Sequence, residues 1–208
     1  MPGRRPLRRS AAGAIVAILA ALVLAADQFV KYLTIENLPE REAVPVLGEF
    51  LQLYYVRNPG AAFSLGSEVT WIFTIALAVV ACAIAWKAFG LQSRLWAIVL
   101  GLLLGGVLGN LTDRLFREPG FPVGHVVDMI SMPWMMPAIF NVADIFIVTG
   151  MISVALLVVT GVGFDGIRER DRVADDETSA YVDADGDDDP ANADAAADTA
   201  SPTGAEER

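Results

Sequence analysis

Aspartates stand at helical spacing from amide or basic residues at three places in the chain. Asp27 and Lys31 in "DQFVK" are four residues apart, and Asn141 and Asp144 in "FNVAD" are three apart. Residues three or four apart share one face of a helix, so each pair forms a polar cluster. The segment "GNLTDR" adds a third cluster, made of Asn110, Asp113 and Arg114.

These clusters border apolar segments, where a carboxylate is costly. A charged side chain at the centre of a membrane helix costs roughly 2.5–3.5 kcal/mol on insertion scales. A single cluster could serve only to anchor a helix end at the membrane surface, and Asp144 could simply cap its helix. Three clusters that all contain aspartate favour a shared polar pocket instead.

A fourth aspartate, Asp128, lies among apolar residues in "GHVVDMI". Apolar neighbours remove water from a carboxyl group and favour its protonated form. A solvated loop residue is the simpler alternative, but the apolar setting favours a buried one. His125, three residues earlier, is expected to form local hydrogen bonds rather than to take part in catalysis.

Asp27 and Asp113 each have a candidate cation nearby in the sequence, Lys31 for the first and Arg114 for the second. Opposite charges favour the ionised carboxylate, so these cations can neutralise two of the four aspartates. The other two aspartates have no obvious partner in the sequence.

Asp128 and Asp144 therefore form a candidate catalytic pair. Two carboxylates brought close together cannot both ionise cheaply, so the pair holds one proton, as in aspartic proteases. The ionised member can take a proton from a water molecule that attacks a carbonyl carbon, while the protonated member hydrogen-bonds to the carbonyl oxygen. The residues thus predict hydrolysis of a peptide bond without a covalent intermediate. Which aspartate carries the proton stays open.

The elements that must position these residues are membrane helices. The chain has 208 residues, 54% of them hydrophobic, and a mean hydropathy of +0.49, values that suggest a polytopic membrane protein. Four stretches without a charged residue approach the roughly 20 residues that a helix needs to cross a bilayer. They are Ser10–Ala26, Val69–Trp86, Leu95–Thr112 and Ile145–Phe164.

The distribution of basic residues predicts the orientation, because cytoplasmic segments carry an excess of Lys and Arg. Basic residues lie before the first span, between the second and third, and after the fourth. They are Arg4, Arg5, Arg8, Arg9, Lys87, Arg94, Arg168, Arg170 and Arg172. Both termini are then cytoplasmic, and residues 28–68 and 113–138 form two outward loops. All three polar clusters fall near the outer membrane surface.

The first span could alternatively be a cleaved signal peptide. It has a basic start, an apolar centre and small residues before Asp27. The three further spans favour a retained helix, and the charge pattern gives the same orientation in either case.

Residues 1–164 are predicted to form a membrane domain, and residues 165–208 an acidic cytoplasmic tail. The tail holds 15 of the chain's 25 acidic residues and 4 of its 15 basic ones, so the net charge of −10 does not describe the membrane domain. Low hydrophobicity and dense like charge predict a disordered tail. No basic surface is large enough to indicate a nucleic-acid partner.

The sequence offers little for metal chemistry. One cysteine, Cys82, lies in an apolar run, and the chain has one histidine, which excludes a cysteine-based or multi-histidine zinc site. The tail segment "DADGDDD" lacks the ligand spacing of an EF-hand. We expect neither a metal nor a cofactor.

The segments "DQFVK", "NPGAAFS", "GGVLGNLTDR", "GHVVDMI" and "FNVAD" occur in this order among the four spans. With them the chain closely resembles the lipoprotein signal peptidase family, also called signal peptidase II, over residues 11–163. The resemblance implies an aspartyl endopeptidase of the bacterial cytoplasmic membrane. Such an enzyme cuts the signal peptide from prolipoproteins just before a cysteine that already carries diacylglycerol. Its partners would be diacylglyceryl-prolipoprotein signal peptides and membrane lipid, and we expect a monomer.

The resemblance also implies roles for individual residues. Asp128 and Asp144 match the catalytic pair of the family. The positions that hold this pair and the substrate match Asp27, Lys31, Asn58, Gly109, Asn110, Asp113, Arg114, Asn141 and Ala143.

The first outward loop is too long, at about 40 residues, to be an ordinary connector. Its segment "FLQLYYVRN" alternates like a short strand, and "NPGAAFSL" interrupts that pattern. Family members have a small sheet and a short surface helix there. The predicted fold is therefore an all-α membrane protein with four transmembrane helices, a small extracytoplasmic insertion of sheet and helix, and a disordered C-terminal tail.

Three alternatives belong to other classes of protein. A proton- or ion-coupled transporter could use membrane carboxylates, but its polar groups should lie near the midplane, and no span interior carries a charge. A Ser–Lys peptidase could use Ser64 with Lys31, but Asp27 one turn away would keep the lysine charged. A non-catalytic assembly factor could use the polar face to bind a partner helix.

Overall fold

The structure is a computed structural model that describes residues 7–60 and 69–174. Residues up to Gly166 form one compact unit, and the chain from Ile167 onward forms a second. The described part of the second unit contains a short helix at 169–174. Most of the predicted acidic tail lies outside the described residues.

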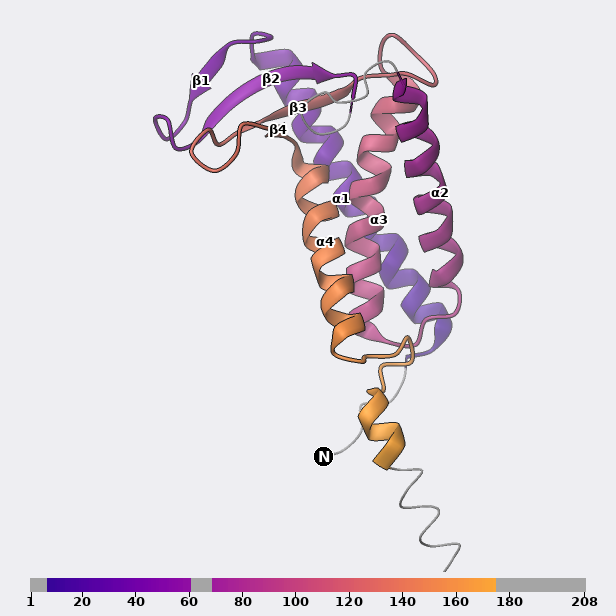
Figure 1. The fold of residues 1–208 in the computed structure, drawn as a ribbon. Coiled ribbons are helices and arrows are strands. Elements are labelled where there is room, and N and C mark those ends of the chain that lie inside the picture. The colour runs from indigo at the N-terminus through magenta and orange to yellow at the C-terminus, as the bar shows by residue number, and fades with distance from the viewer. Residues whose placement is uncertain (1–6, 61–68, 175–208) are drawn as a thin grey trace, which may run out of the picture. The chain divides into compact units, whose positions relative to one another are not determined.

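Four helices make up most of the first unit (Figure 1). They are α1 (Arg9–Asn37), α2 (Thr70–Ala88), α3 (Arg94–Phe116) and α4 (Val142–Val159). All four are long and apolar enough to cross a membrane. The prediction of four spanning helices is therefore confirmed.

The two largest differences between the observed helix ends and the predicted spans occur in α1 and α4. α1 does not stop at Ala26 but continues through Asp27 and Lys31 to Asn37. Those two polar side chains are fully buried against other elements, so the helix persists where the local sequence turns polar. α4 ends at Val159 rather than at Phe164, because the chain turns after it through Gly161, whose φ is 65°.

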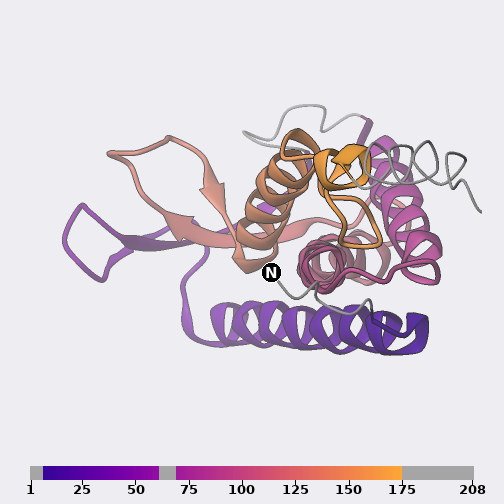
Figure 2. The same cartoon turned by 90° about the horizontal axis from the view of Figure 1, so that it is seen from below.

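α3 lies at the centre of the bundle (Figure 2), where it is seen end-on with the other helices around it. It packs against α1, α2 and α4. Glycines on α3 allow α1 to come close, since an added Cβ would lie 3.0 Å from the Leu19 Cβ at Gly101 and 2.5 Å from the Val23 Cβ at Gly105. This close packing along the apolar half of α1 favours a retained helix over a cleaved signal peptide.

The glycine contact makes a testable prediction about stability. Gly105→Ala should destabilise the protein by about 1–3 kcal/mol, because the added methyl forces α1 and α3 apart. Gly13→Ala, also inside a helix, is the matched control, since an added Cβ there meets nothing within 4 Å. The control should be neutral or slightly stabilising because alanine favours the helix. Thermal unfolding in detergent measures both, and equal midpoints for the two variants would contradict the prediction.

A four-stranded antiparallel sheet joins the two loops at one end of the bundle. Its strands are β1 (Ala43–Pro45), β2 (Gln52–Asn58), β3 (Val126–Ser131) and β4 (Ile139–Phe140), and they pair in this order. β2 confirms the strand predicted in "FLQLYYVRN", whereas β3, in the second outward loop, and β4, directly after that loop, were not predicted as strands. The surface helix implied for "NPGAAFSL" falls mostly at residues outside the described ranges.

The two faces of the sheet have different roles. Tyr55, Val127 and Met129 are buried on one face and pack against apolar side chains of the extended α1 and of the residue after it, namely Val30, Ile35 and Leu38. Side chains alternate along a strand, so Asp128 points to the opposite face. Asp128 pairs with Val56 across the β2–β3 ladder, next to a register shift in β2. The apolar face thus attaches the sheet to α1 and leaves Asp128 on the face that is free for a site.

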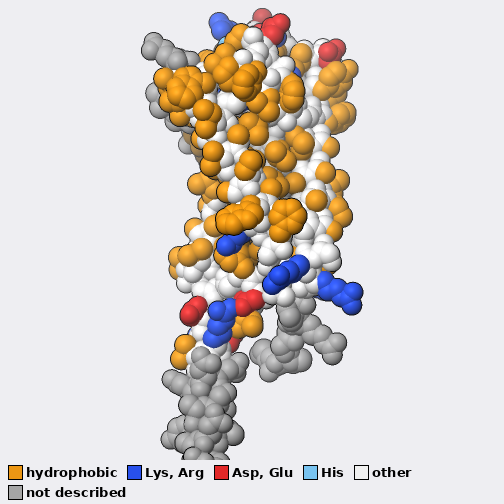
Figure 3. Space-filling model, turned by 90° about the vertical axis from the view of Figure 1, so that its right-hand side faces the viewer, with side chains coloured by type: hydrophobic (Ala, Val, Ile, Leu, Met, Phe, Trp, Pro, Cys, Tyr) orange, Lys and Arg blue, Asp and Glu red, His pale blue; other side chains and the backbone are white. Residues whose placement is uncertain are grey.

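The bundle has two chemically distinct ends. The sheet lies at one end, while the start of α1, the end of α4 and the α2–α3 connection lie at the other (Figure 1). In the space-filling view, apolar side chains cover the flank between the ends and charged ones gather toward the ends (Figure 3). This pattern matches a protein that crosses a bilayer.

Candidate active site

Lys31 is the centre of a buried ionic network. Its Nζ lies 2.9 Å from Asp27 Oδ2, 2.7 Å from Asp113 Oδ2 and 3.0 Å from Asn110 Oδ1. The side chains of Lys31 and of both aspartates are fully buried. An ammonium group has three N–H donors, and all three have an acceptor here. Lys31 therefore ties α1 to α3 and neutralises charge at two carboxylates.

Both aspartates also accept hydrogen bonds from further elements. Asp27 Oδ1 accepts a hydrogen bond of 2.9 Å from the backbone N–H of Ala143, in the first turn of α4. Asp113 Oδ2 accepts one of 3.1 Å from the backbone N–H of Val127, directly before Asp128 on β3. The network thus fixes both segments that carry the candidate catalytic pair.

The expected pairing of Arg114 with Asp113 is wrong. Consecutive helix residues point in different directions, and the cations on Asp113 are Lys31 and, at 2.6 Å, Arg117, one turn later. Arg114 instead donates to backbone carbonyl oxygens of Pro59 at 2.9 Å, Gly124 at 3.1 Å and Gly60. It holds the end of β2 against the loop that leads into β3.

Two asparagines connect this network to the catalytic candidates. Asn110 accepts from Lys31 and donates through Nδ2 to Asp144 Oδ1 at 2.8 Å. Asn141 donates through Nδ2 to Asp128 Oδ1 at 2.6 Å and to Asn110 Oδ1 at 3.1 Å. Its Oδ1 also accepts from the Asp144 backbone N–H at 3.0 Å, and its own N–H donates to Asp144 Oδ2 at 3.1 Å. Asp128 and Asp144 therefore flank one residue, Asn141.

The bonds between Asn141 and Asp144 form a capping box at the start of α4. This capping box explains why a membrane helix can begin with a carboxylate. Asp144 satisfies an N–H that the helix would otherwise leave unpaired, and its charge complements the helix dipole.

Asp128 is buried and accepts a second hydrogen bond, of 2.8 Å, from Asn58 Nδ2. Burial and, to a lesser extent, the charge of Asp144 raise the pKa of Asp128 to about 7, against the opposing effect of the two asparagine bonds. A carboxyl with this pKa can hold or release a proton near neutral pH, as general acid–base catalysis requires.

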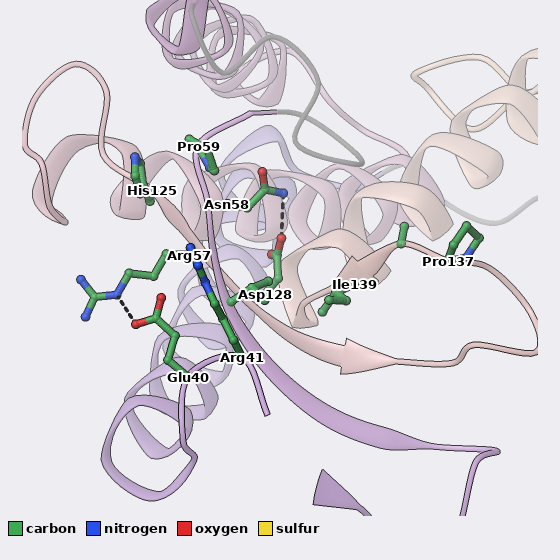
Figure 4. A pocket seen from close by; sticks show the side chains of 11 residues that line it. Glu40, Arg41, Arg57, Asn58, Pro59, His125, Asp128, Pro137 and Ile139 are labelled. Atoms are coloured by element: carbon green, nitrogen blue, oxygen red, sulfur yellow. Dashed lines mark hydrogen bonds and ion pairs between the residues drawn. The ribbon is translucent and has the colours of Figure 1, made fainter. Parts of the chain in front are cut away.

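Asp128 opens onto a pocket of about 620 Å³ on the free face of the sheet. In Figure 4 the Asn58–Asp128 hydrogen bond and the Arg57–Glu40 ion pair lie in the same pocket, with Ile139 and Pro137 on the side away from His125. One wall is thus charged and the other apolar. Burial lowers the pKa of His125 and so favours its neutral imidazole.

The remaining predicted residues, Gly109 and Ala143, are small and allow the helices to pack closely beside Asp27. A Cβ at Gly109 would lie 2.5 Å from Asp27 Oδ2 and 3.1 Å from the Ala143 Cβ, so only glycine leaves room for this part of the network. Two participants were missed by the sequence reasoning. Gln28 donates to Asp27 and Asp113, and Arg117 pairs with Asp113. The i,i+4 spacing of Asp113 and Arg117 was the available signal.

The fold and the site define a membrane protein whose polar centre lies at one end of a four-helix bundle. A family model described as "Signal peptidase (SPase) II" matches residues 19–160. A lipoprotein signal peptidase of Leifsonia xyli is 52% identical over 160 residues, which cover 77% of this chain and 74% of the relative. One of Mycobacterium avium is 41% identical over 169 residues, covering 81% and 90%.

Two solved structures share the fold. Each is described as a bacterial membrane enzyme structure obtained by the in meso method, one at 2.3 Å and one at 1.9 Å resolution. They superpose with TM-scores of 0.64 and 0.62 at 24% identity, covering 76% and 75% of this chain and 92% and 97% of theirs.

The chain belongs to the signal peptidase II family and is a protease of bacterial membranes. The sequence-based resemblance is confirmed, whereas the transporter alternative gains no support from these comparisons.

Proposed function

We propose that Asp128 and Asp144 are the catalytic pair of this peptidase and that they remove the signal peptide from prolipoproteins just before the lipid-modified cysteine. One observation carries the proposal. Two carboxylates from different elements, the buried Asp128 on a strand and the half-buried Asp144 on a helix, are held by the same asparagine, and Asp128 opens onto a pocket. Among the described residues, neither carboxylate has a cation within ion-pair distance.

The hydrolysis then proceeds by general acid–base catalysis. The pair shares one proton, and its ionised member takes a proton from the attacking water. The protonated member donates a hydrogen bond to the scissile carbonyl oxygen and later supplies the proton that the leaving amine needs. Asn110, Asn141 and Asn58 donate to the carboxylates, so each keeps a fixed orientation while its charge changes.

The surroundings of the pair support a peptide substrate with a lipid group. The pocket beside Asp128 has a charged wall with Arg57 and Glu40 and an apolar wall with Pro137 and Ile139. The polypeptide that follows the cleavage point would lie along the charged wall. The diacylglyceryl group would leave along the apolar wall toward the bilayer.

We further propose that the chain is a monomer of the bacterial cytoplasmic membrane with both termini in the cytoplasm. The basic residues Arg8, Arg9, Lys87 and Arg94 belong to the end of the bundle opposite the sheet, which supports this orientation. The hydrogen-bonded network around Lys31 is built within one chain, which supports a monomer.

The direct test is cleavage of a diacylglyceryl-modified precursor by the purified protein in detergent. The matched substrate is the same precursor without the lipid on its cysteine. We expect the modified precursor to be cut and the unmodified one to remain. An intact modified precursor would contradict the proposal. The Ser–Lys alternative is not favoured, because Lys31 is bound to two carboxylates, while Ser64 lies outside the described residues.

The pKa of Asp128 predicts the pH dependence of cleavage. The pair needs its shared proton, and a carboxyl with a pKa of about 7 loses it as the pH rises through 7. Activity should therefore fall on the alkaline side of neutrality. Asn58→Ala removes a hydrogen bond that favours the ionised form of Asp128, so its pKa should rise further and the alkaline limb should move to higher pH.

The size of that shift follows from the lost bond. A hydrogen bond to a charged group is worth roughly 1.5–3 kcal/mol, which corresponds to about one to two pH units. The measurement is kcat/KM for the lipid-modified precursor from pH 5 to 9. Glu36→Gln, an exposed change on α1, is the control and should keep the parent profile. A limb that stays in place or moves to lower pH in Asn58→Ala would refute this assignment.

A further inference from the structure

The outer edge of the sheet carries a group of exposed apolar side chains that no part of the site uses. We call it the apolar tip and define it as Val46, Leu47, Phe50, Trp134, Met135 and Met136. Leu47 is 61% exposed and Trp134 is 58% exposed. The residues come from the β1–β2 turn and the β3–β4 loop, which project sideways from the bundle (Figure 1).

The tip is ordered by internal contacts. The ring of Phe50 stacks on the ring of Trp134 with centroids 4.7 Å apart, and Trp134 Nε1 donates to the Phe50 carbonyl at 2.8 Å. The single polar atom of the indole is thereby satisfied inside the protein. The ring can then enter an apolar environment without leaving a hydrogen-bond donor unpaired.

The charge content of the two tip segments is low. Residues 46–51 and 132–139 read "VLGEFL" and "MPWMMPAI", and Glu49 is the one ionisable side chain among them. Tryptophan and other large apolar residues are enriched where proteins meet the boundary between lipid headgroups and acyl chains. The composition of the tip therefore matches a lipid surface.

The length of α4 limits how far the apolar tip can lie from the hydrocarbon core of the bilayer. α4 has 18 residues, so it is about 27 Å long at 1.5 Å per residue. A bilayer's hydrocarbon core is about 30 Å thick, so α4 needs its whole length to cross and cannot raise its first turn far into water. β4 leads through Asn141 directly into that turn, and Ile145 at its end and Val148 in the next turn are exposed on the surface of the helix. The apolar tip thus continues the lipid-facing surface of α4.

From the exposure, the order, the composition and the height together, we propose that the apolar tip inserts into the outer leaflet of the bilayer, at the boundary between headgroups and acyl chains. That the tip enters the outer leaflet follows from the proposed orientation, in which both termini are cytoplasmic. Such an anchor would hold β3, and with it Asp128, at the depth at which a diacylglyceryl group leaves the bilayer.

Depth-dependent quenching of a fluorophore tests this directly. In a Cys82→Ala background, an environment-sensitive fluorophore is attached after Leu47→Cys, and the control carries it after Glu42→Cys, at the exposed position directly before β1. The full chain is reconstituted in phosphatidylcholine vesicles that contain lipids with a nitroxide high on the acyl chain, and iodide is the quencher in water.

We expect the nitroxide lipid to quench the label at position 47 roughly threefold more strongly than the label at 42, and iodide to show the reverse order. Equal quenching at the two positions would overturn the proposal. Protection of position 47 from both quenchers would also overturn it, because that result indicates a protein partner. The measurement involves no cleavage, so it can fail while the peptidase assignment holds, and the reverse.

A functional measurement complements it. Leu47→Gln with Met135→Gln makes the tip polar without touching the network around Lys31. We expect its KM for the lipid-modified precursor in vesicles to rise roughly tenfold with kcat unchanged, since the sheet no longer rests at the lipid boundary. Unchanged KM in vesicles would contradict the anchoring role.

Discussion

Asp128→Asn and Asp144→Asn should each reduce cleavage of a lipid-modified precursor to the detection limit. Each removes one member of the pair that moves protons in the transition state, and a positioned proton transfer is worth roughly 10²–10⁴-fold in rate. Asparagine keeps the shape of aspartate and can still accept a hydrogen bond, so the partners at Asn141 and Asn110 remain usable. The measurement is the single-turnover cleavage rate of each purified variant.

The folded state provides the necessary control for these two variants. Burial raises the pKa of Asp128, so its ionised form destabilises the fold progressively as the pH rises from the unfolded value near 4 toward 7. Asp128→Asn removes that penalty and should leave the unfolding temperature equal or higher at pH 7. Glu36→Gln on the exposed face of α1 should retain full activity. Substantial cleavage by either aspartate variant would exclude the proposed mechanism.

Lys31→Met should have the largest effect on stability. The change keeps an unbranched side chain of similar length but leaves Asp27 and Asp113 buried without their shared cation. Breaking a buried ion pair by removing one partner costs about 3–5 kcal/mol, because the remaining charge has lost its compensation. Since Asp113 also binds the Val127 N–H, β3 should loosen together with the helices.

Thermal unfolding in detergent and limited proteolysis near β3 measure these two consequences. Lys87→Met is the matched control, because this lysine is exposed, lies over the Phe164 ring at 4.5 Å and takes no part in the network around Lys31. It should cost at most about 1 kcal/mol. A second variant, Lys31→Met with Asp27→Asn, should recover part of the stability, since Asp113 keeps Arg117 as a counter-ion whereas Asp27 has no other cation within ion-pair distance among the described residues. Equal unfolding of the parent and Lys31→Met would show that the network does not hold the site.

The pattern of charges and apolar runs was sufficient to predict four helices and to group the polar residues at one end. Hydropathy could not predict that α1 continues to Asn37, because Asp27 and Lys31 interrupt the apolar run and only their partners on α3 make a buried helix possible there. Likewise, the apolar segment around Asp128 gave no information about which strand it would join. The register with β2 depends on contacts between two loops that are far apart in the chain.

The assignment of partners within the site was only partly predictable. Adjacency in sequence suggested Arg114 for Asp113, but adjacent helix residues diverge, and Arg117 occupies the position that spacing favours. The role of Arg114 in binding backbone carbonyl groups has no signature in side-chain types at all. Gly109 and Ala143 could be selected only through the family resemblance, because what matters there is the absence of bulk beside Asp27.

The i,i+4 contact between Asp27 and Lys31 also bears on biogenesis. Synthesis proceeds from the N-terminus, so α1 reaches the membrane before α3 and α4 exist. A lone ammonium group would then face lipid, whereas the neighbouring carboxylate gives it a counter-ion from its own helix. Asp113 completes the neutralisation when α3 arrives, and the remaining oxygen of Asp27 stays available to receive α4 through the Ala143 N–H. The ionic network around Lys31 can therefore form stepwise, in the order in which α1, α3 and α4 are synthesised.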